Sequence, residues 1–111
     1  MLIASIFLAA MAPAPAGNVD ATRGAFTKCL RGHLKKQLEA KVGEAEFEMS
    51  VKSACDDEQS AFKAAVSAAN RAGGDSAADA DENAQMQIDD YYANFTDKFK
   101  DYASTNTLPG E

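Results

Sequence analysis

The chain has 111 residues, of which 46% are hydrophobic and 25% charged, and its formal net charge is −6 at pH 7. This length allows one small domain, and the acidic balance disfavours nucleic acid as a partner. Two cysteines and one histidine leave few residues for metal or nucleophilic chemistry.

The first sixteen residues, MLIASIFLAAMAPAPA, have the pattern of a secretory signal peptide. An apolar run over residues 2–12 is followed by small residues and proline, as in the hydrophobic and cleavage regions of such signals. The run is shorter than the roughly 20 residues that cross a bilayer, so we expect no stable membrane span after cleavage. Cleavage near Ala16 would place residues 17–111 in the periplasm or outside the cell.

Large apolar residues recur every four positions in residues 19–42, which predicts an amphipathic helix. They are Phe26, Leu30, Leu34, Leu38 and Val42. Asp20 falls in the first turn, where a negative charge is favourable. Gly43 is expected to end the helix, because glycine commonly follows the last residue of a periodic run.

Residues 44–72 are predicted to form a second, uninterrupted helix. Its apolar face contains Phe47, Val51, Ala54, Cys55, Phe62, Ala65, Val66 and Ala69. Glu58 lies on the same face, and we expect it to reach the rim or to pair with Arg23. Paired glycines at residues 73–74 end the helix, since each costs about 1 kcal/mol inside one, and Asp75 or Ser76 caps the next.

Residues 76–103 are predicted to form a third helix, and residues 104–111 a flexible tail. The buried face of this helix contains Ile88, Tyr92, Phe95, Phe99 and Tyr102, which leaves Tyr91 on the flank. No segment alternates with the two-residue period of a strand. The sequence therefore predicts an all-α domain over residues 17–103, folded as a three-helix antiparallel bundle.

The two cysteines fall at matching heights in the predicted hairpin of the first two helices. Facing residues in an antiparallel hairpin have positions with a constant sum, and the midpoint of Cys29 and Cys55 lies beside Gly43. The same register places Phe26 near Glu58. Because an even number of cysteines in an exported chain favours pairing, we predict a Cys29–Cys55 disulfide, worth about 3–4 kcal/mol for a loop of this length.

A metal site is the alternative for Cys29. Cys29 and His33 share a helix face at a spacing of four, and Cys55 and Asp56 could add ligands across the hairpin. The chain would then be a periplasmic metal-binding or metal-sensing protein. Exported thiols tend to oxidise, and a solvated or partly packed histidine is the simpler expectation. We therefore predict no metal and no cofactor.

Residues 79–90 match part of a calcium-binding loop. Its positions 1, 3, 5 and 12 are Asp79, Asp81, Asn83 and Asp90. Position 6 is Ala84, where the sharp turn of the loop requires glycine. We therefore expect no calcium site, and we expect these acidic residues to stabilise the amino end of the third helix instead.

No G-x-S-x-G elbow or phosphate loop is present, and we predict that the protein is not an enzyme.

Charge is divided unevenly along the chain. Residues 17–43 carry six basic and two acidic side chains, and residues 44–111 carry five basic and fifteen acidic ones. In the simplest interpretation, this complementarity orders the bundle and keeps it soluble. In the functional interpretation, the exposed side of the first helix binds an anionic envelope component or another protein through Lys28, Arg31 and Lys35.

The motifs TKCL and EFEMSVKSACDDEQSAFKAA are followed by a glycine break and an alanine- and acid-rich helix with tyrosines. This layout resembles small exported helical hypothetical proteins of alphaproteobacteria and covers most of residues 17–111. The resemblance implies a periplasmic location and transfers no site residue or activity. Together, the sequence predicts a disulfide-linked, exported helical protein that acts as a non-catalytic binding or structural module of the cell envelope.

Overall fold

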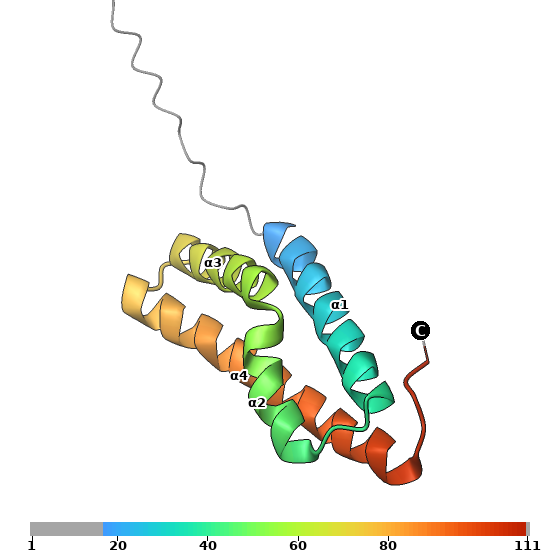
Figure 1. Cartoon of the computed structure of the whole chain (residues 1–111). Coiled ribbons are helices and arrows are strands. Elements are labelled where there is room, and N and C mark those ends of the chain that lie inside the picture. Colours follow the sequence, from blue (N-terminus) through green and yellow to red (C-terminus); the bar gives the residue numbers. More distant parts are fainter. Residues whose placement is uncertain (1–16, 111) are drawn as a thin grey trace, which may run out of the picture.

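The computed structural model describes residues 17–110, and the predicted signal peptide lies outside these residues. The described chain consists of four helices and contains no strand: α1 (Gly17–Glu39), α2 (Glu44–Ala54), α3 (Asp56–Ala72) and α4 (Ala77–Thr105) (Figure 1). The long α4 runs beside α3 over its first half and beside α2 over its second, and α1 contacts all three. The all-α prediction is confirmed.

The predicted second helix is divided in two at Cys55. This residue has φ −125° and ψ 45°, outside the helical region, and it both ends α2 and precedes α3. The prediction of three helices is therefore wrong, although the outer limits of the second one are correct. The break places the acidic residues 56–58 in the first turn of α3, where the helix dipole favours them, and it directs α2 and α3 onto different parts of α4.

The turn between α1 and α2 depends on Lys41 rather than on glycine. Lys41 is left-handed, with φ 54°, and the Val42 N–H donates to the Gln37 carbonyl at 3.3 Å. These are features of a Schellman helix end. Gly43 has an extended conformation and directly precedes α2. The prediction that Gly43 ends the first helix is thus wrong, because the helix ends four residues earlier.

The turn between α3 and α4 follows the sequence prediction closely. Gly74 has φ 110°, which glycine adopts without steric cost. The Ser76 hydroxyl oxygen then accepts a hydrogen bond from the Asp79 N–H at 3.1 Å and caps α4. At the other end, α4 continues to Thr105, two residues beyond the predicted limit.

Each helix contributes one face to a shared core. The buried hydrophobic residues are Phe26, Leu30, Leu34, Leu38, Phe47, Val51, Cys55, Phe62, Ala65, Val66, Ala80, Ala84, Ile88, Tyr92, Phe95 and Phe99. Val42 and Tyr102, also predicted in the core, are partly buried and pack against it. Ala54 is exposed, since the helix that was expected to bury it ends at this residue.

An aromatic group that we call the α3 cluster joins α1, α3 and α4. The rings of Phe26 and Phe62 stack with centroids 5.7 Å apart, and Tyr91 meets both of them edge-on. Tyr91 is therefore packed against the core rather than left free on the flank. On α3, the ring that stacks on Phe26 is Phe62, which lies one helical turn beyond Glu58, the predicted neighbour.

A second group, the α2 cluster, joins α1, α2 and α4. The ring of Phe47 lies between His33 and Phe99, with centroids 5.5 Å and 4.5 Å away. On α1, Phe26 precedes Cys29 by one turn and His33 follows it by one turn. The disulfide therefore divides the two aromatic clusters along α1.

Candidate functional site

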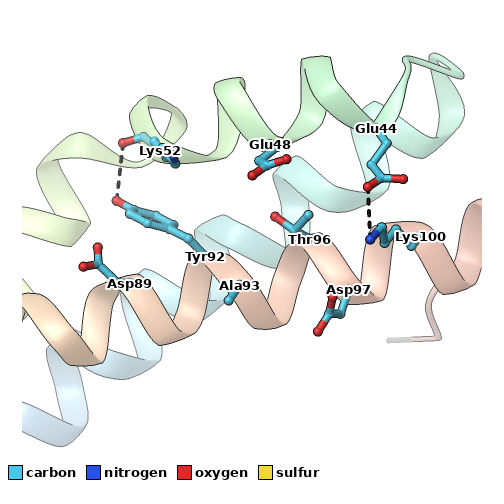
Figure 2. A pocket seen from close by; sticks show the side chains of 9 residues that line it. All are labelled: Glu44, Glu48, Lys52, Asp89, Tyr92, Ala93, Thr96, Asp97 and Lys100. Carbon is cyan, nitrogen blue, oxygen red and sulfur yellow. Dashed lines mark hydrogen bonds and ion pairs between the residues drawn. The ribbon is translucent and has the colours of Figure 1, made fainter.

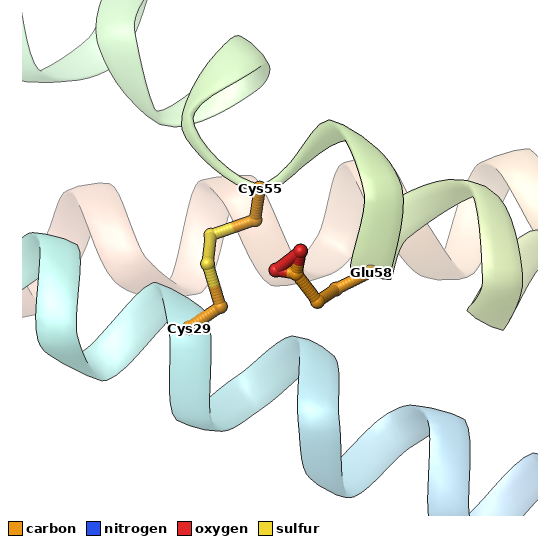
Figure 3. Close-up of side chains that lie close together, drawn as sticks. All are labelled: Cys29, Cys55 and Glu58. Atoms are coloured by element: carbon orange, nitrogen blue, oxygen red, sulfur yellow. A yellow bond between two sulfur atoms is a disulfide. The ribbon is translucent and has the colours of Figure 1, made fainter.

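The predicted disulfide between Cys29 and Cys55 is present. It connects the middle of α1 to the break between α2 and α3, and the two Cα atoms are 6.1 Å apart (Figure 3). Cys55 is almost fully buried, whereas Cys29 is partly exposed. The bond closes a loop with a sequence separation of 26, for which the chain-entropy model gives about 3–4 kcal/mol of stabilisation.

The carboxylate of Glu58 points toward this disulfide (Figure 3). Glu58 lies in the first turn of α3, and one of its carboxylate oxygens and the two sulfur atoms all lie within 4.8 Å of one another. Its side chain is partly buried and has no hydrogen bond or ion pair with any residue in the described part of the chain. Arg23, the predicted partner, instead pairs with Asp20 at 3.1 Å.

His33 belongs to a different contact. Its Nε2 atom is 2.8 Å from the Ser50 hydroxyl oxygen on α2, and that hydroxyl donates to the Phe47 carbonyl at 3.2 Å. Burial, assisted by the positive charge of Lys36, lowers the pKa of His33 below its ordinary value of 6.5. The imidazole is therefore neutral at pH 7, and it connects α1 to α2.

The structure does not gather the metal-ligand set that the sequence suggested. Within residues 17–110, the group of potential ligands that lie close together is Cys29, Cys55 and Glu58, without His33 or Asp56. The spacing of three places Glu58 on the helix face of Cys55, but the break at Cys55 is what brings its carboxylate to the sulfur atoms. The sequence predicted Glu58 at the rim or beside Arg23, and neither prediction places it beside the disulfide.

Residues 79–90 lie entirely within α4. An EF-hand binds calcium by wrapping a loop around the ion, whereas a continuous helix distributes its side chains around its circumference. Asp79 occupies the first turn of α4, next to the Ser76 cap. The amino end of the helix therefore accounts for Asp79, whereas Asp89 and Asp90 are exposed residues in the middle of α4.

A groove of about 530 Å³ separates α2 from α4 (Figure 2). It is lined by Glu44, Glu48, Lys52, Asp89, Tyr92, Ala93, Thr96, Asp97 and Lys100. Glu44 and Lys100 form an ion pair across it at 3.1 Å. The hydrogen bond to Glu44 and the charge of that carboxylate raise the pKa of Lys100. The groove is therefore bridged at one end by a surface ion pair.

Tyr92 closes the other end of the groove. Its hydroxyl donates to the Lys52 carbonyl at 3.3 Å (Figure 2). In an unbroken helix the amide of residue 56 would bond to this carbonyl, so Tyr92 replaces a hydrogen bond lost at the break. Burial and the carboxylates of Asp56 and Asp89 raise the pKa of Tyr92, which keeps its proton available for donation.

The three basic residues singled out in the sequence lie on one side of α1. Lys28, Arg31 and Lys35 are spaced by three and four residues, which places them on the same helix face. Lys28 and Arg31 are exposed, and Lys35 is partly buried. We call this surface the basic face. It is held in place by the neighbouring disulfide at Cys29.

These features define a small helical bundle linked by one disulfide. No protein-family model, curated protein or solved structure matches the chain. None of the helices within residues 17–110 combines the length and the apolar character that crossing a membrane requires. The resemblance to exported alphaproteobacterial proteins stays a prediction from the sequence.

Proposed function

We propose that the protein is an exported, non-catalytic binding module that attaches to an anionic component of the cell envelope through the basic face. The signal-like amino terminus supports export, and the disulfide fits an oxidising compartment. The observation that carries the proposal is the exposure of Lys28 and Arg31 on a molecule whose net charge is −6. A cationic surface on an acidic protein favours anionic partners locally.

Lys28 and Arg31 are available for binding and are held on a rigid support. Neither Lys28 nor Arg31 has an ion pair or hydrogen bond with another residue of the described chain. Cys29 lies between them, and its disulfide holds this stretch of α1 against the bend between α2 and α3. Guanidinium and ammonium groups bind phosphate oxygens through charge-assisted hydrogen bonds. We therefore expect lipid phosphate groups to be the target.

Binding to vesicles tests the proposal. Wild-type protein should bind vesicles of phosphatidylglycerol, with an affinity that falls as salt is added, and should not bind phosphatidylcholine vesicles. The variant K28E/R31E/K35E should lose this binding while keeping its helicity by circular dichroism. A matched triple reversal on the other helices, K52E/R71E/K98E, changes the net charge equally and should bind as wild type does.

Two results would contradict the proposal. Equal binding by both triple variants would show that the basic face has no special role. Absence of wild-type binding to anionic vesicles would exclude lipid phosphate as the target, and an acidic protein would then be the remaining anionic partner for the same surface.

The alternative function, metal binding through Cys29 and His33, has no support from the geometry. It would require His33 to leave Ser50, and His33 is not among the potential ligands that lie close to the sulfur atoms within residues 17–110. The carboxylate beside the sulfur atoms belongs to Glu58 rather than to Asp56.

A further inference from the structure

We propose that reduction of the disulfide creates a zinc site formed by Cys29, Cys55 and Glu58. The three ligand atoms come from α1, from the break between α2 and α3, and from the first turn of α3, and they lie within 4.8 Å of one another. Two thiolates and one carboxylate form a ligand set that Zn²⁺ accepts, with water in the fourth tetrahedral position.

The first turn of α3 favours an acidic residue at Glu58, but the helix dipole does not explain why the carboxylate faces the disulfide. Its carboxylate is partly buried and points at two sulfur atoms that carry no proton to donate (Figure 3). No cation or N–H group of residues 17–110 pairs with it. A partly buried charge without a partner is unfavourable, and a bound divalent cation would compensate it.

The site can form without movement of the helices. Thiolates bound to zinc at about 2.3 Å in tetrahedral geometry are roughly 3.8 Å apart. The Cα atoms of Cys29 and Cys55 are 6.1 Å apart, so rotation of the two side chains provides that separation once the bond between the sulfur atoms is broken. Cys29 and Glu58 are partly exposed, which leaves a path for the ion from solvent.

The carboxylate also selects among metals. Copper(I) prefers ligand sets made of sulfur alone, whereas zinc tolerates a mixture of sulfur and oxygen. The presence of Glu58 beside two thiolates therefore favours zinc.

Breaking the disulfide requires a two-electron reductant, and a dithiol is the class of reductant that acts by thiol–disulfide exchange. A thiolate of the dithiol attacks the more exposed Sγ of Cys29, and Cys55 leaves as a thiolate. The second thiol of the reductant then releases Cys29. Two electrons pass to the protein, and the reductant becomes a disulfide. Binding of Zn²⁺ displaces the two cysteine thiol protons to solvent. Reduction therefore creates the zinc site and oxidation removes it. Neither step involves the basic face.

Cobalt is the spectroscopic probe for this site. The full chain, stripped of metal and reduced with a phosphine under nitrogen, is titrated with Co²⁺ and then with Zn²⁺. We expect thiolate-to-cobalt charge-transfer absorption that saturates at a single ion per chain and disappears when zinc displaces cobalt. The oxidised protein should show no such absorption, and its absence in the reduced protein would overturn the proposal.

Three variants identify the ligands. E58Q should lower the zinc affinity at least about 10-fold, since loss of even a second-sphere group costs that much. D57N, in the same turn of α3, and H33Q should bind zinc as wild type does. Unchanged affinity in E58Q, or a loss in H33Q alone, would overturn the assignment.

If reduction unfolds the chain, the recovery of helicity on addition of zinc, measured by circular dichroism, tests the proposal. In that case zinc should restore helicity to wild type but not to E58Q, because metal binding is then coupled to folding. Failure of zinc to restore wild-type helicity would overturn the proposal. The K28E/R31E/K35E variant should bind zinc normally, which separates this proposal from the proposed function.

Discussion

The α2 cluster and the α3 cluster rest on the same two helices, α1 and α4, but they hold their third helix differently. Three rings, Phe26, Phe62 and Tyr91, form the α3 cluster, and α3 has 17 residues. In the α2 cluster, Phe47 lies between Phe99 and a histidine, and α2 has 11 residues. Polar contacts from His33, Tyr92 and Lys100 supplement the packing of α2.

This difference shows how a short helix is stabilised. Isolated helices below about 12–15 residues are marginal in water, so α2 depends on the groups that surround it. Its two buried residues are Phe47 and Val51. We therefore expect α2 to be the first part of the bundle to open, and its stability to respond to the protonation of His33. Polar contacts also join α3 to α4, through Lys63 and Asn70, but they add to a longer helix with three buried residues.

The largest expected loss of stability comes from removing a buried ring, and its effect on α2 should differ between the two clusters. Both F47A and F62A remove a fully buried ring and should lower the free energy of unfolding by about 3–5 kcal/mol. Hydrogen exchange should distinguish them, because F47A should expose the amides of α2 selectively, whereas F62A should not. Equal loss of protection in α2 and α3 in the F47A protein would contradict the comparison.

A smaller effect is expected from the hydroxyl that caps α2. Y92F keeps the buried ring but removes the bond to the Lys52 carbonyl, and it should lower stability by about 1 kcal/mol in denaturant unfolding. Tyr91 provides the matched control, since its hydroxyl has no hydrogen-bond partner among residues 17–110. Y91F should therefore be close to neutral, and equal effects of the two substitutions would show that Tyr92 does not cap α2.

The smallest effect concerns pH. Because folding lowers the pKa of His33, the unfolded chain binds more protons than the folded one as the pH falls. The contribution of the neutral imidazole to the free energy of unfolding is therefore complete above about pH 6.5 and declines below it. The loss should be under about 1 kcal/mol, since the ring is only partly buried. Unfolding measured between pH 7.5 and 5.5 should show this decline in wild type and a flatter response in H33Q. A response of the same size in both would assign the decline to other groups.

Much of the core could be predicted from spacing, because helix periodicity determines which side chains share a face. The stripe from Phe26 to Leu38 and the pairing of Cys29 with Cys55 were both recognised in this way. The position of Glu58 beside the disulfide was not recognised, since it depends on where α3 begins. The contact between His33 and Ser50 likewise requires the relative placement of two helices.

The break at Cys55 marks the limit of sequence reasoning here. The acidic residues 56–58 are a signal for a helix start, but they are equally compatible with the exposed surface of a longer helix. The same ambiguity applies to the turn at 41–43, where a lysine rather than the nearby glycine adopts the left-handed conformation. A single sequence does not contain the packing that chooses between such alternatives.

By itself, the sequence determined the helical class, the buried faces, the disulfide and the glycine turn before α4. These follow from local periodicity, chain connectivity and the conformational freedom of glycine. Tertiary structure alone decided that the middle helix breaks, that Tyr92 caps α2 and that Glu58 faces the sulfur atoms. The reason is that each of these depends on how α2 and α3 fit along different lengths of α4, which is a property of the assembled core.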